Sequence, residues 1–210
     1  MAGYTIIYFP ARGRAELTRL TIAAAGQEFK EQIVGGDSLV EFKKSDKCLF
    51  GQVPVLLDGD NVIAQSNAMA RHVARKHKLQ GSPDQAVAAD MILDHWADIL
   101  NGIVPLVFGP GADLEKLNAY VKDTLPGKIA GFEQFVKDGG YIRGDSLSFA
   151  DLALFQAVES LVDNAYISAE SHPNLIKHKE LVEKNENIAK YLKSETRHGK
   201  GVFADAIPKK

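Results

Sequence analysis

The chain has 210 residues, of which 45% are hydrophobic and 25% are charged, and its formal net charge is −2. This composition predicts a soluble globular protein with one large core or two smaller ones. Both signs of charge are interspersed, which leaves no basic field for a nucleic acid or an anionic membrane, so neither partner is expected.

Cysteine content and hydropathy indicate where the protein works. Cys48 is the single cysteine, which excludes an intrachain disulfide. The N-terminal apolar run is too short for a signal peptide, and no apolar stretch approaches the ~20 residues of a membrane helix. We expect a cytoplasmic protein in which Cys48 is either a reactive thiol or an inert one.

The first eighty residues alternate between strand and helix patterns. The apolar, β-branched run YTIIYF is typical of a strand, and the helix that follows ends at Gly26, a residue type that favours helix termination. The turn residues at 58–60 join two short apolar runs into a hairpin. The predicted order is strand 4–9, helix 12–25, strand 28–34, helix 37–47, a hairpin within 51–66 and helix 66–79.

Beyond the turn-rich residues 80–84 the apolar periodicity is helical throughout. We therefore expect an α/β domain of pattern βαβαββα over 1–79, a linker over 80–84 and an all-α domain over 85–210. The predicted helices of the second domain are 84–107, 113–137, 148–163, 173–184 and 188–193. The helix from Ser148 begins with a capping-box pattern, because Asp151 lies three residues on, and we interpret this pair as a folding determinant.

The two ends of the hairpin carry polar residues that a buried hairpin does not need. If the bond between Val53 and Pro54 is cis, it turns the backbone of Val53 outward, where an extended ligand can pair with it. Gln65 and Ser66 open a helix, whose N-terminal N–H groups favour a carboxylate. The alternatives are a trans proline and a serine that only caps its helix. The two ends together suggest a peptide-like ligand with a carboxylate, held in a cleft between the domains.

Several segments resemble the cytosolic glutathione S-transferases, closest to the pi class with some sigma-like character. They are YTIIYFPARGRAE, CLFGQVPVLLDGDNVIAQSNAMARHVARKHKL, LPGKIAGFE and GDSLSFADLALF. The resemblance covers nearly the whole chain in order. It implies a thioredoxin-like domain followed by an all-helical domain, a homodimer, and glutathione as co-substrate.

The same resemblance implies a set of glutathione-binding residues. The backbone of Val53 would pair with the cysteinyl unit, and Gln65 and Ser66 would bind the γ-glutamyl carboxylate. Lys44 is the candidate for the glycyl carboxylate, although the spacing from Gln52 places Ser45 at the pi-class lysine and Leu39 at the pi-class tryptophan. The implied set is Arg14, Lys44, Gln52, Val53, Pro54, Gln65 and Ser66, with Asp98 from the partner subunit.

Tyr8 occupies the position of the family's catalytic tyrosine. A phenol has a pKa of ~10 and a free thiol one of ~8.5, so at neutral pH the phenol can donate a hydrogen bond to a thiolate. One charge-assisted hydrogen bond of ~1.5–3 kcal/mol is enough to lower a thiol pKa by one to two units. Arg14 would hold local structure and add positive potential near the thiolate; the alternative is an arginine that forms a salt bridge at a helix start. The alternative for Tyr8 is a core aromatic, a role that we assign to Tyr4.

The resemblance also implies an electrophile pocket and a dimer interface. The pocket residues would be Phe9, Ala11, Phe108 and Phe203. Phe50 resembles an aromatic key that enters the other subunit near Met91, Ile92 and His95. Reciprocal ion pairs across a twofold axis would join Arg71 and Arg75 to Asp90 and Asp94; the alternative is that both charged rows are solvated helix faces.

The sequence contains no metal-binding, Walker or dinucleotide motif. We expect an enzyme whose glutathione thiolate attacks small hydrophobic electrophiles. The alternatives are a glutathione-dependent isomerase of the prostaglandin D synthase type, and a non-enzymatic ligand carrier or structural protein on the same scaffold.

Overall fold

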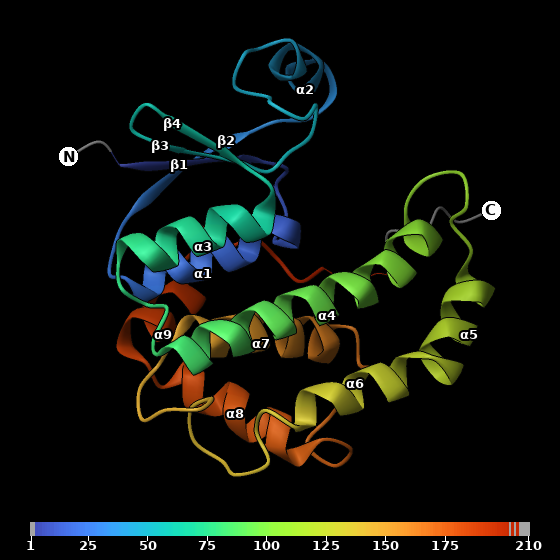
Figure 1. The fold of residues 1–210 in the computed structure, drawn as a ribbon. Coiled ribbons are helices and arrows are strands. Elements are labelled where there is room, and N and C mark those ends of the chain that lie inside the picture. Colours follow the sequence, from blue (N-terminus) through green and yellow to red (C-terminus); the bar gives the residue numbers. More distant parts are fainter. Residues whose placement is uncertain (1–2, 202, 204, 206–210) are drawn as a thin grey trace. The chain divides into compact units, whose positions relative to one another are not determined.

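The computed structural model describes residues 3–201, 203 and 205 (Figure 1). The chain divides into two compact units. The first runs to Gln80 and also includes Glu183–Lys200, whereas the second comprises Gly81–Val182 and the described residues from Gly201 on. The predicted division placed every residue from 85 on in the second domain, so the main difference is the segment Glu183–Lys200.

A four-stranded sheet forms the centre of the first unit, in the spatial order β2-β1-β3-β4. β1 runs parallel to β2 and antiparallel to β3, and β3 and β4 form the predicted hairpin. Gly59 in its turn has a φ of 61°, a left-handed conformation that glycine adopts without cost. The strands are β1 (Tyr4–Tyr8), β2 (Phe29–Ile33), β3 (Val55–Asp58) and β4 (Asn61–Ala64).

Side chains alternate along β1 and therefore join two different cores. Tyr4, Ile6 and Tyr8 pack with residues of α1 (Glu16–Ala24) and α3 (Ser66–Lys76), whereas Ile7 packs with Phe42 of α2 (Gly36–Lys43). Figure 1 shows α1 and α3 together on one side of the sheet and α2 on the other. Burying each large apolar side chain stabilises the fold by roughly 1.5–3 kcal/mol. The predicted α/β class and its order are confirmed.

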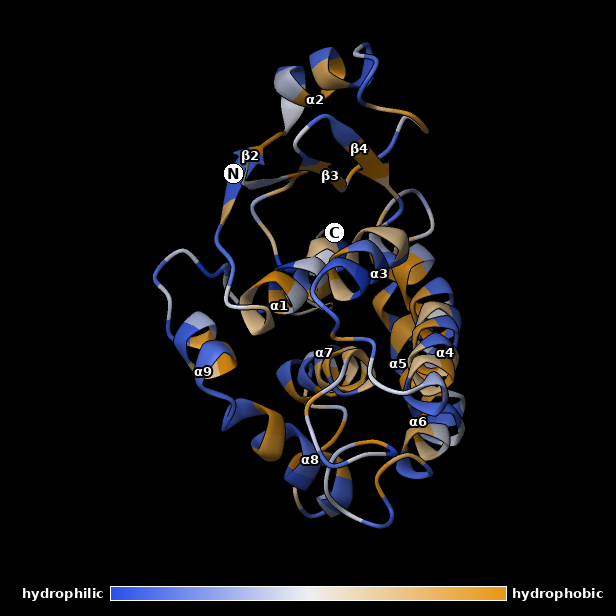
Figure 2. Cartoon of the chain, turned by 60° about the vertical axis from the view of Figure 1, so that its left-hand side comes forward, coloured by the Kyte–Doolittle hydropathy of each residue, from blue (hydrophilic) through white to orange (hydrophobic). Residues whose placement is uncertain are grey.

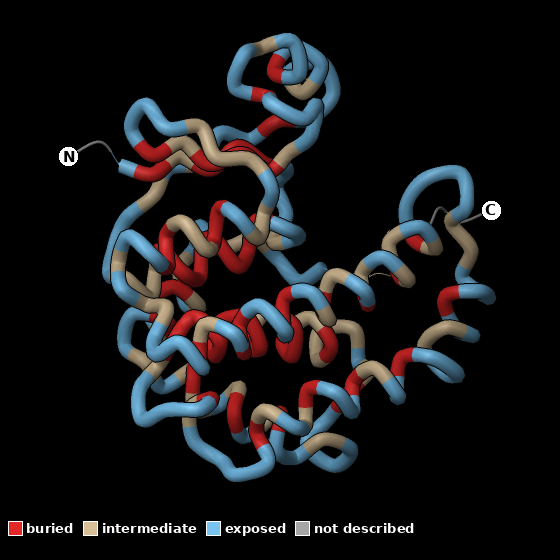
Figure 3. The backbone as a smooth tube through the Cα atoms, in the orientation of Figure 1, coloured by how far each residue is buried: buried red, intermediate tan, exposed pale blue. Residues whose placement is uncertain are grey.

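Helices make up the second unit. α4 carries hydrophobic residues on one side and hydrophilic ones on the other (Figure 2), as expected for a helix with one buried face. α7 is mostly buried, in contrast to α2 of the first unit, where only Phe42 is buried (Figure 3). The helices are α4 (Pro83–Val107), α5 (Leu114–Asp123), α6 (Leu125–Glu133), α7 (Phe149–Asp163) and α8 (Pro173–Glu183); α9 (Glu186–Leu192) belongs to the first unit.

The structure has two helices where the sequence predicts one. The segment 113–137 is divided at Thr124, which ends α5 and precedes α6. Pro126 lies in the first turn of α6, and because proline lacks an N–H it suits a helix start and interrupts a continuous helix. The prediction of a single helix was therefore wrong at this point.

The start of α7 is organised by a buried carboxylate. Asp151 accepts hydrogen bonds from the N–H and the hydroxyl of Ser148, both at 2.8 Å, and from the N–H of Ile142 at 2.8 Å. Its Oδ1 also lies 3.0 Å from Nε2 of the buried His178. The predicted capping pair is confirmed. Asp151 also connects α7 to α8, through His178, and to the loop before α7, through Ile142.

No helix in the described part of the chain is long and apolar enough to cross a membrane.

Candidate active site

A pocket of about 440 Å³ opens in the first unit. This volume lies within the range of small-molecule sites. Both ends of the hairpin contribute to the pocket, as the sequence predicts, together with the loop after β1 and with α2. The lining residues are Phe9, Arg14, Leu39, Lys43, Phe50, Gly51, Gln52, Val53, Pro54, Ala64, Gln65 and Ser66.

The loop before β3 supplies one wall of the pocket. The bond between Val53 and Pro54 is cis, which was one of the two possibilities considered. Pro54 is buried and Val53 half-buried, whereas the side chain of Gln52 is exposed to the pocket. The loop therefore presents the polar side chain of Gln52 to the pocket, next to residues that are packed into the fold.

The start of α3 lines the pocket at the same end of the hairpin, since Val55 of β3 pairs with Ala64 of β4. Gln65 is the N-cap residue, its side chain makes no capping hydrogen bond, and Ser66 is the first helical residue. Ser66 is therefore not the cap, contrary to the simpler alternative. Gln65 has a φ of 68°, which costs a residue with a side chain on the order of 1–3 kcal/mol and is found most often at functional sites. This end of the helix carries N–H groups and a positive dipole that suit a carboxylate.

Tyr8 ends β1 and is not itself among the lining residues of the pocket. It is 8% exposed, and its hydroxyl oxygen accepts a hydrogen bond from the backbone N–H of Arg14 at 3.1 Å. Phe9 and Arg14, on either side of this contact, both line the pocket. Gly13 makes the close approach feasible, because a Cβ at this position would lie 2.6 Å from the Tyr8 hydroxyl oxygen and its φ is +40°.

The lining residues carry positive charge. Arg14 and Lys43 are the cations among them, and the lining contains no Asp or Glu. Lys44 is not part of the lining; its Nζ lies 2.7 Å from Oε1 of Glu41 in an exposed ion pair. The structure thus places the neighbouring lysine at the pocket, because consecutive residues of a helix end point in different directions.

The four residues predicted for an electrophile pocket belong to different units. Phe9 lines the pocket and is 37% exposed. Ala11 is exposed in the same loop but is outside the lining. In the second unit, Phe108 follows α4 and is 54% exposed, and the N–H of Phe203 donates to Oδ1 of Asn164 at 2.7 Å. The role of these residues stays a prediction.

Tyr4 fills the core role that the sequence assigns to it. It is 5% exposed, and its hydroxyl lies 2.8 Å from Nε2 of His77. Burial raises the pKa of Tyr4, as does the charge of nearby Asp58. Burial also acts to raise the pKa of Asp58, but hydrogen bonds from Lys76 and His72 outweigh it and hold that pKa below its usual value.

The residues predicted for a dimer interface are distributed over α3, α4 and the loop after α2. Phe50 is 63% exposed and also lines the pocket. Arg75 is exposed and Arg71 half-buried on α3. On α4, Asp90, Asp94 and Asp98 are all exposed, as is Met91, whereas Ile92 is buried and His95 lies 2.7 Å from the carbonyl oxygen of Lys128.

Three features of this region do not follow from the sequence patterns. They are the places of Leu39 and Lys43 in the pocket lining and the close approach of Gly13 to Tyr8. For Gly13 a signal existed, since a glycine between two arginines after a strand marks a tight turn. Among the described residues, no group of three or more His, Cys, Asp or Glu side chains is placed to hold a metal.

Two family models match the chain in order: "Glutathione S-transferase, N-terminal domain" over residues 4–75 and "Glutathione S-transferase, C-terminal domain" over 97–195. Human glutathione S-transferase P is 37% identical over 73% of this chain and 74% of its own length. The probable glutathione S-transferase 7 of Caenorhabditis elegans is 34% identical over 92% of this chain and 97% of its own.

The chain belongs to the glutathione S-transferase family. The predicted enzyme class, glutathione transferase, is thereby confirmed. A solved structure agrees: the monomeric glutathione S-transferase Na-GST-3 of the hookworm Necator americanus is 33% identical, covers 92% of this chain and 97% of its own, and has a TM-score of 0.78. The sigma-like character stays a prediction.

Proposed function

We propose that Tyr8 stabilises the thiolate of glutathione, which then attacks the electrophilic carbon of a small hydrophobic substrate. The observation that carries the proposal is the hydrogen bond from the Arg14 N–H to the Tyr8 hydroxyl oxygen at 3.1 Å. A tyrosine hydroxyl has one proton and two lone pairs. Because Arg14 donates to the oxygen, the Tyr8 proton is left to be donated to sulfur, and hydrogen bonds in such a chain strengthen one another.

Charge complementarity supports glutathione as the ligand. Glutathione has two carboxylates and, once activated, a thiolate. The pocket lining combines two cations, the N-terminus of α3 and no acidic side chain. We propose that Gln65 and Ser66 bind the γ-glutamyl carboxylate and that the backbone of Val53 pairs with the cysteinyl unit, beside Gln52 and Pro54.

For the glycyl carboxylate we propose Lys43 in place of Lys44. Lys43 lines the pocket, and the ammonium of Lys44 pairs with Glu41 in solvent. Arg14 adds positive potential at the thiolate end of the pocket, since it is both a lining residue and the next residue after Gly13.

In the reaction, a proton leaves the thiol for solvent, a sulfur–carbon bond forms, and with an aryl halide the halide departs with the electron pair of the broken bond. We propose that the apolar face of Phe9 contributes to electrophile binding. The contributions of Ala11, Phe108 and Phe203 stay predictions.

The test is the rate of glutathione conjugation to a chromogenic aryl halide from pH 5 to 9, measured for the wild type and Tyr8→Phe. Loss of most activity below pH 8, with the apparent thiol pKa moved toward that of free glutathione, is the expected result. If Tyr8→Phe keeps the wild-type pH profile, Tyr8 is not the activating group. If the wild type binds glutathione but converts no electrophile in a broad panel, the carrier or structural alternative takes its place.

We further propose a homodimer that works in the cytoplasm. Exposed Phe50 and Met91 are large apolar side chains of the kind that an interface covers. Arg71 and Arg75 on α3 would pair with Asp90 and Asp94 of the partner subunit, and Asp98 would reach the partner's glutathione. The similar hookworm protein is described as monomeric. Light scattering of the wild type and Phe50→Ala distinguishes the two states, and a wild-type mass of one chain would reject the dimer.

The single, unpaired Cys48 is consistent with the reducing environment of the proposed cytoplasmic location.

A further inference from the structure

A buried charge cluster contacts the loop that follows Tyr8 and has no part in the proposed chemistry. We call it the Arg19 cluster and define it as Glu16, Arg19, Glu31, Tyr191, Arg197 and His198. Its centre, Arg19, is 1% exposed and Glu16 is 2% exposed. Two carboxylates thus face two guanidinium groups, and all of these residues belong to the first unit.

Arg19 is bound by both carboxylates. Its Nε donates to Oε1 of Glu31 at 2.8 Å, and its Nη1 donates to Oε2 of Glu16 at 3.2 Å. The planar guanidinium, which presents its donors in a rigid fork, is therefore fixed in one orientation.

Residues of Glu183–Lys200, which we call the C-terminal segment, also bind these carboxylates. Arg197 donates to Oε1 of Glu16 from Nε at 3.0 Å and from Nη2 at 2.9 Å. Nε2 of His198 lies 2.9 Å from Oε2 of Glu31. The Tyr191 hydroxyl donates to Oε2 of Glu16 at 3.1 Å. Residues of the C-terminal segment thus complete a site built on β2 and α1.

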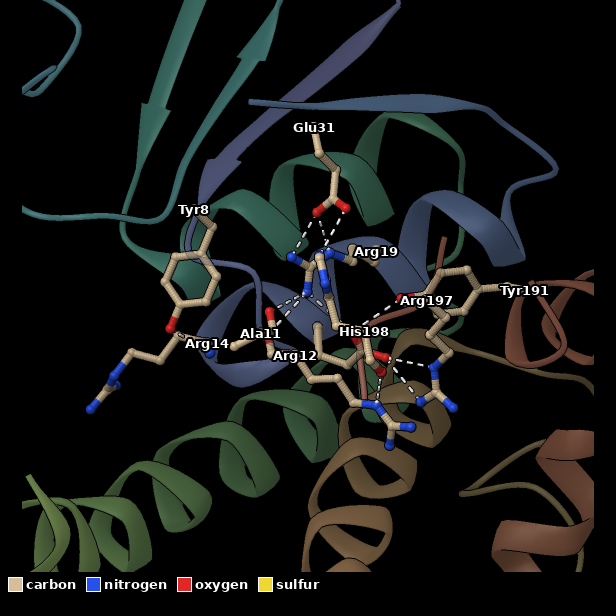
Figure 4. Close-up of polar contacts among 10 residues, drawn as sticks. Tyr8, Ala11, Arg12, Arg14, Arg19, Glu31, Tyr191, Arg197 and His198 are labelled. Carbon is tan, nitrogen blue, oxygen red and sulfur yellow. Dashed lines mark hydrogen bonds and ion pairs between the residues drawn. The ribbon is translucent and has the colours of Figure 1, made fainter. Parts of the chain in front are cut away.

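Arg19 also holds the loop that leads away from Tyr8. Its Nη1 donates to the carbonyl oxygens of Ala11 at 3.1 Å and of Arg12 at 3.0 Å. Nε of Arg12 in turn donates to the carbonyl oxygen of His198 at 2.8 Å. Figure 4 shows the guanidinium of Arg19 between Glu31 and the loop, while the side chain of Arg14 points away from the cluster. The loop is therefore held at two consecutive carbonyls and ends at the N–H that binds Tyr8.

Stability alone is a weak explanation for such a cluster, because buried ion pairs can often be replaced by apolar side chains without loss. An apolar side chain in place of Arg19 could not donate hydrogen bonds to the carbonyl oxygens of the loop. The carbonyls of Ala11 and Arg12 lie two and one residues before Gly13, where the backbone runs so close to Tyr8 that an added Cβ would lie 2.6 Å from its hydroxyl oxygen. Orientation of this loop is the property that the cluster supplies.

We propose that Arg19, braced by Arg197 and His198 of the C-terminal segment, is a positioning residue that keeps the Arg14 N–H on the Tyr8 hydroxyl. The inference rests on the proposed role of Tyr8. Loosening the loop weakens the bond to the Tyr8 oxygen, so that Tyr8 donates less strongly to the thiolate. Glutathione binding is affected far less, because Gln52, Gln65 and Ser66 lie on other segments.

The experiment compares Arg19→Lys, Arg197→Met and Arg12→Gln with the wild type. Arg19→Lys keeps the charge but not the fork, and Arg197→Met removes the brace. Arg12→Gln removes the Nε donor to the His198 carbonyl oxygen at a half-buried position. Glu195→Gln is the control, because Glu195 is an exposed acid of the same segment. For each variant the pKa of bound glutathione is titrated through the ultraviolet absorbance of its thiolate, and kcat and KM for glutathione are measured. Circular dichroism establishes which variants fold.

The expected result for Arg19→Lys and Arg197→Met is a bound-thiol pKa about one unit higher, which lowers kcat at pH 6.5 roughly five- to tenfold and leaves the KM for glutathione within about twofold. Arg197→Lys should recover part of the loss, Arg12→Gln should show a smaller shift in the same direction, and the control should match the wild type.

Folded variants that bind glutathione with the wild-type thiol pKa would overturn the inference and leave the cluster a structural one. If Arg19→Lys and Arg197→Met do not fold, Arg12→Gln decides in the same way. The role of Tyr8 is tested separately by Tyr8→Phe: an altered pKa there with none in the cluster variants rejects this inference alone, whereas an unaltered pKa in Tyr8→Phe rejects both.

Discussion

Replacing Gly13 by alanine should impair both stability and activity, because the position meets Tyr8 directly. The new Cβ would lie 2.6 Å from the Tyr8 hydroxyl oxygen and 3.0 Å from its ring Cε1, at a φ of +40°. Ordinary contact begins at 3.4 Å, so the hydroxyl must retreat by 3.4 − 2.6 = 0.8 Å. The hydrogen bond from Arg14 is already 3.1 Å long, and a displacement of this size weakens or breaks it.

The expected cost has two parts. A left-handed backbone costs a residue with a Cβ about 1–2 kcal/mol, and the lost hydrogen bond costs about 1 kcal/mol more. We therefore expect the free energy of unfolding to fall by roughly 2–3 kcal/mol. Because a misplacement near 1 Å costs on the order of 100-fold in catalysis, kcat/KM should fall by about 10- to 100-fold.

Gly36→Ala is the matched control. Gly36 has a φ of +50° but no atom within 4 Å of the added Cβ, so this variant carries the backbone cost without the contact. Urea unfolding and aryl halide conjugation are measured for both variants. Equal kcat/KM in Gly13→Ala and Gly36→Ala would refute the reasoning, because the contact with Tyr8 would then have no consequence.

Three other changes have expected outcomes. Lys43→Gln should raise the KM for glutathione about tenfold at unchanged kcat, the effect of one lost charge-assisted contact, whereas Lys44→Gln should leave steady-state kinetics unaltered. Asp58→Asn should remove a pH dependence of stability: the folded pKa of Asp58 is lowered, so its contribution is present above the unfolded pKa of ~3.9 and is lost as the pH falls through the folded pKa. Urea unfolding of the wild type and of Asp58→Asn between pH 7 and about 2 measures this pH dependence. Parallel curves of the free energy of unfolding against pH would contradict the prediction. Asp151→Ala should destabilise the chain by more than ~3 kcal/mol, because two backbone N–H groups lose their partner; a loss near ~1 kcal/mol, typical of an ordinary cap, would show that they are satisfied otherwise.

Local patterns predicted the residues that form the pocket walls. Gln52, Pro54 and Ser66 were found from the two polar ends of a hairpin, and they indeed lie around one pocket. They could be found because each belongs to a short motif whose geometry the neighbouring residues determine. The capping pair at the start of α7 was found in the same way.

Other features depend on geometry that short patterns do not contain. Whether Lys43 or Lys44 faces the pocket depends on where α2 begins, and element ends are uncertain by a residue or two. Nothing local indicated that Arg19 would be buried, because its partners Arg197 and His198 lie far away along the chain. Only the spacing of Glu16 and Arg19, one helical turn apart beside apolar residues, could have hinted at an ion pair.

The assignment of Glu183–Lys200 to the first unit has a consequence for synthesis on the ribosome. Residues up to Gln80 emerge well before Tyr191 and Arg197, because the second unit is translated between them. Until then Glu16 lacks the donors that these two residues supply, at the centre of an otherwise assembled core. The first unit is thus completed only after residues 81–182 of the second have been synthesised. A fragment that stops at Gln80 would either bury the Glu16 carboxylate without these donors or leave that part of its core open to water.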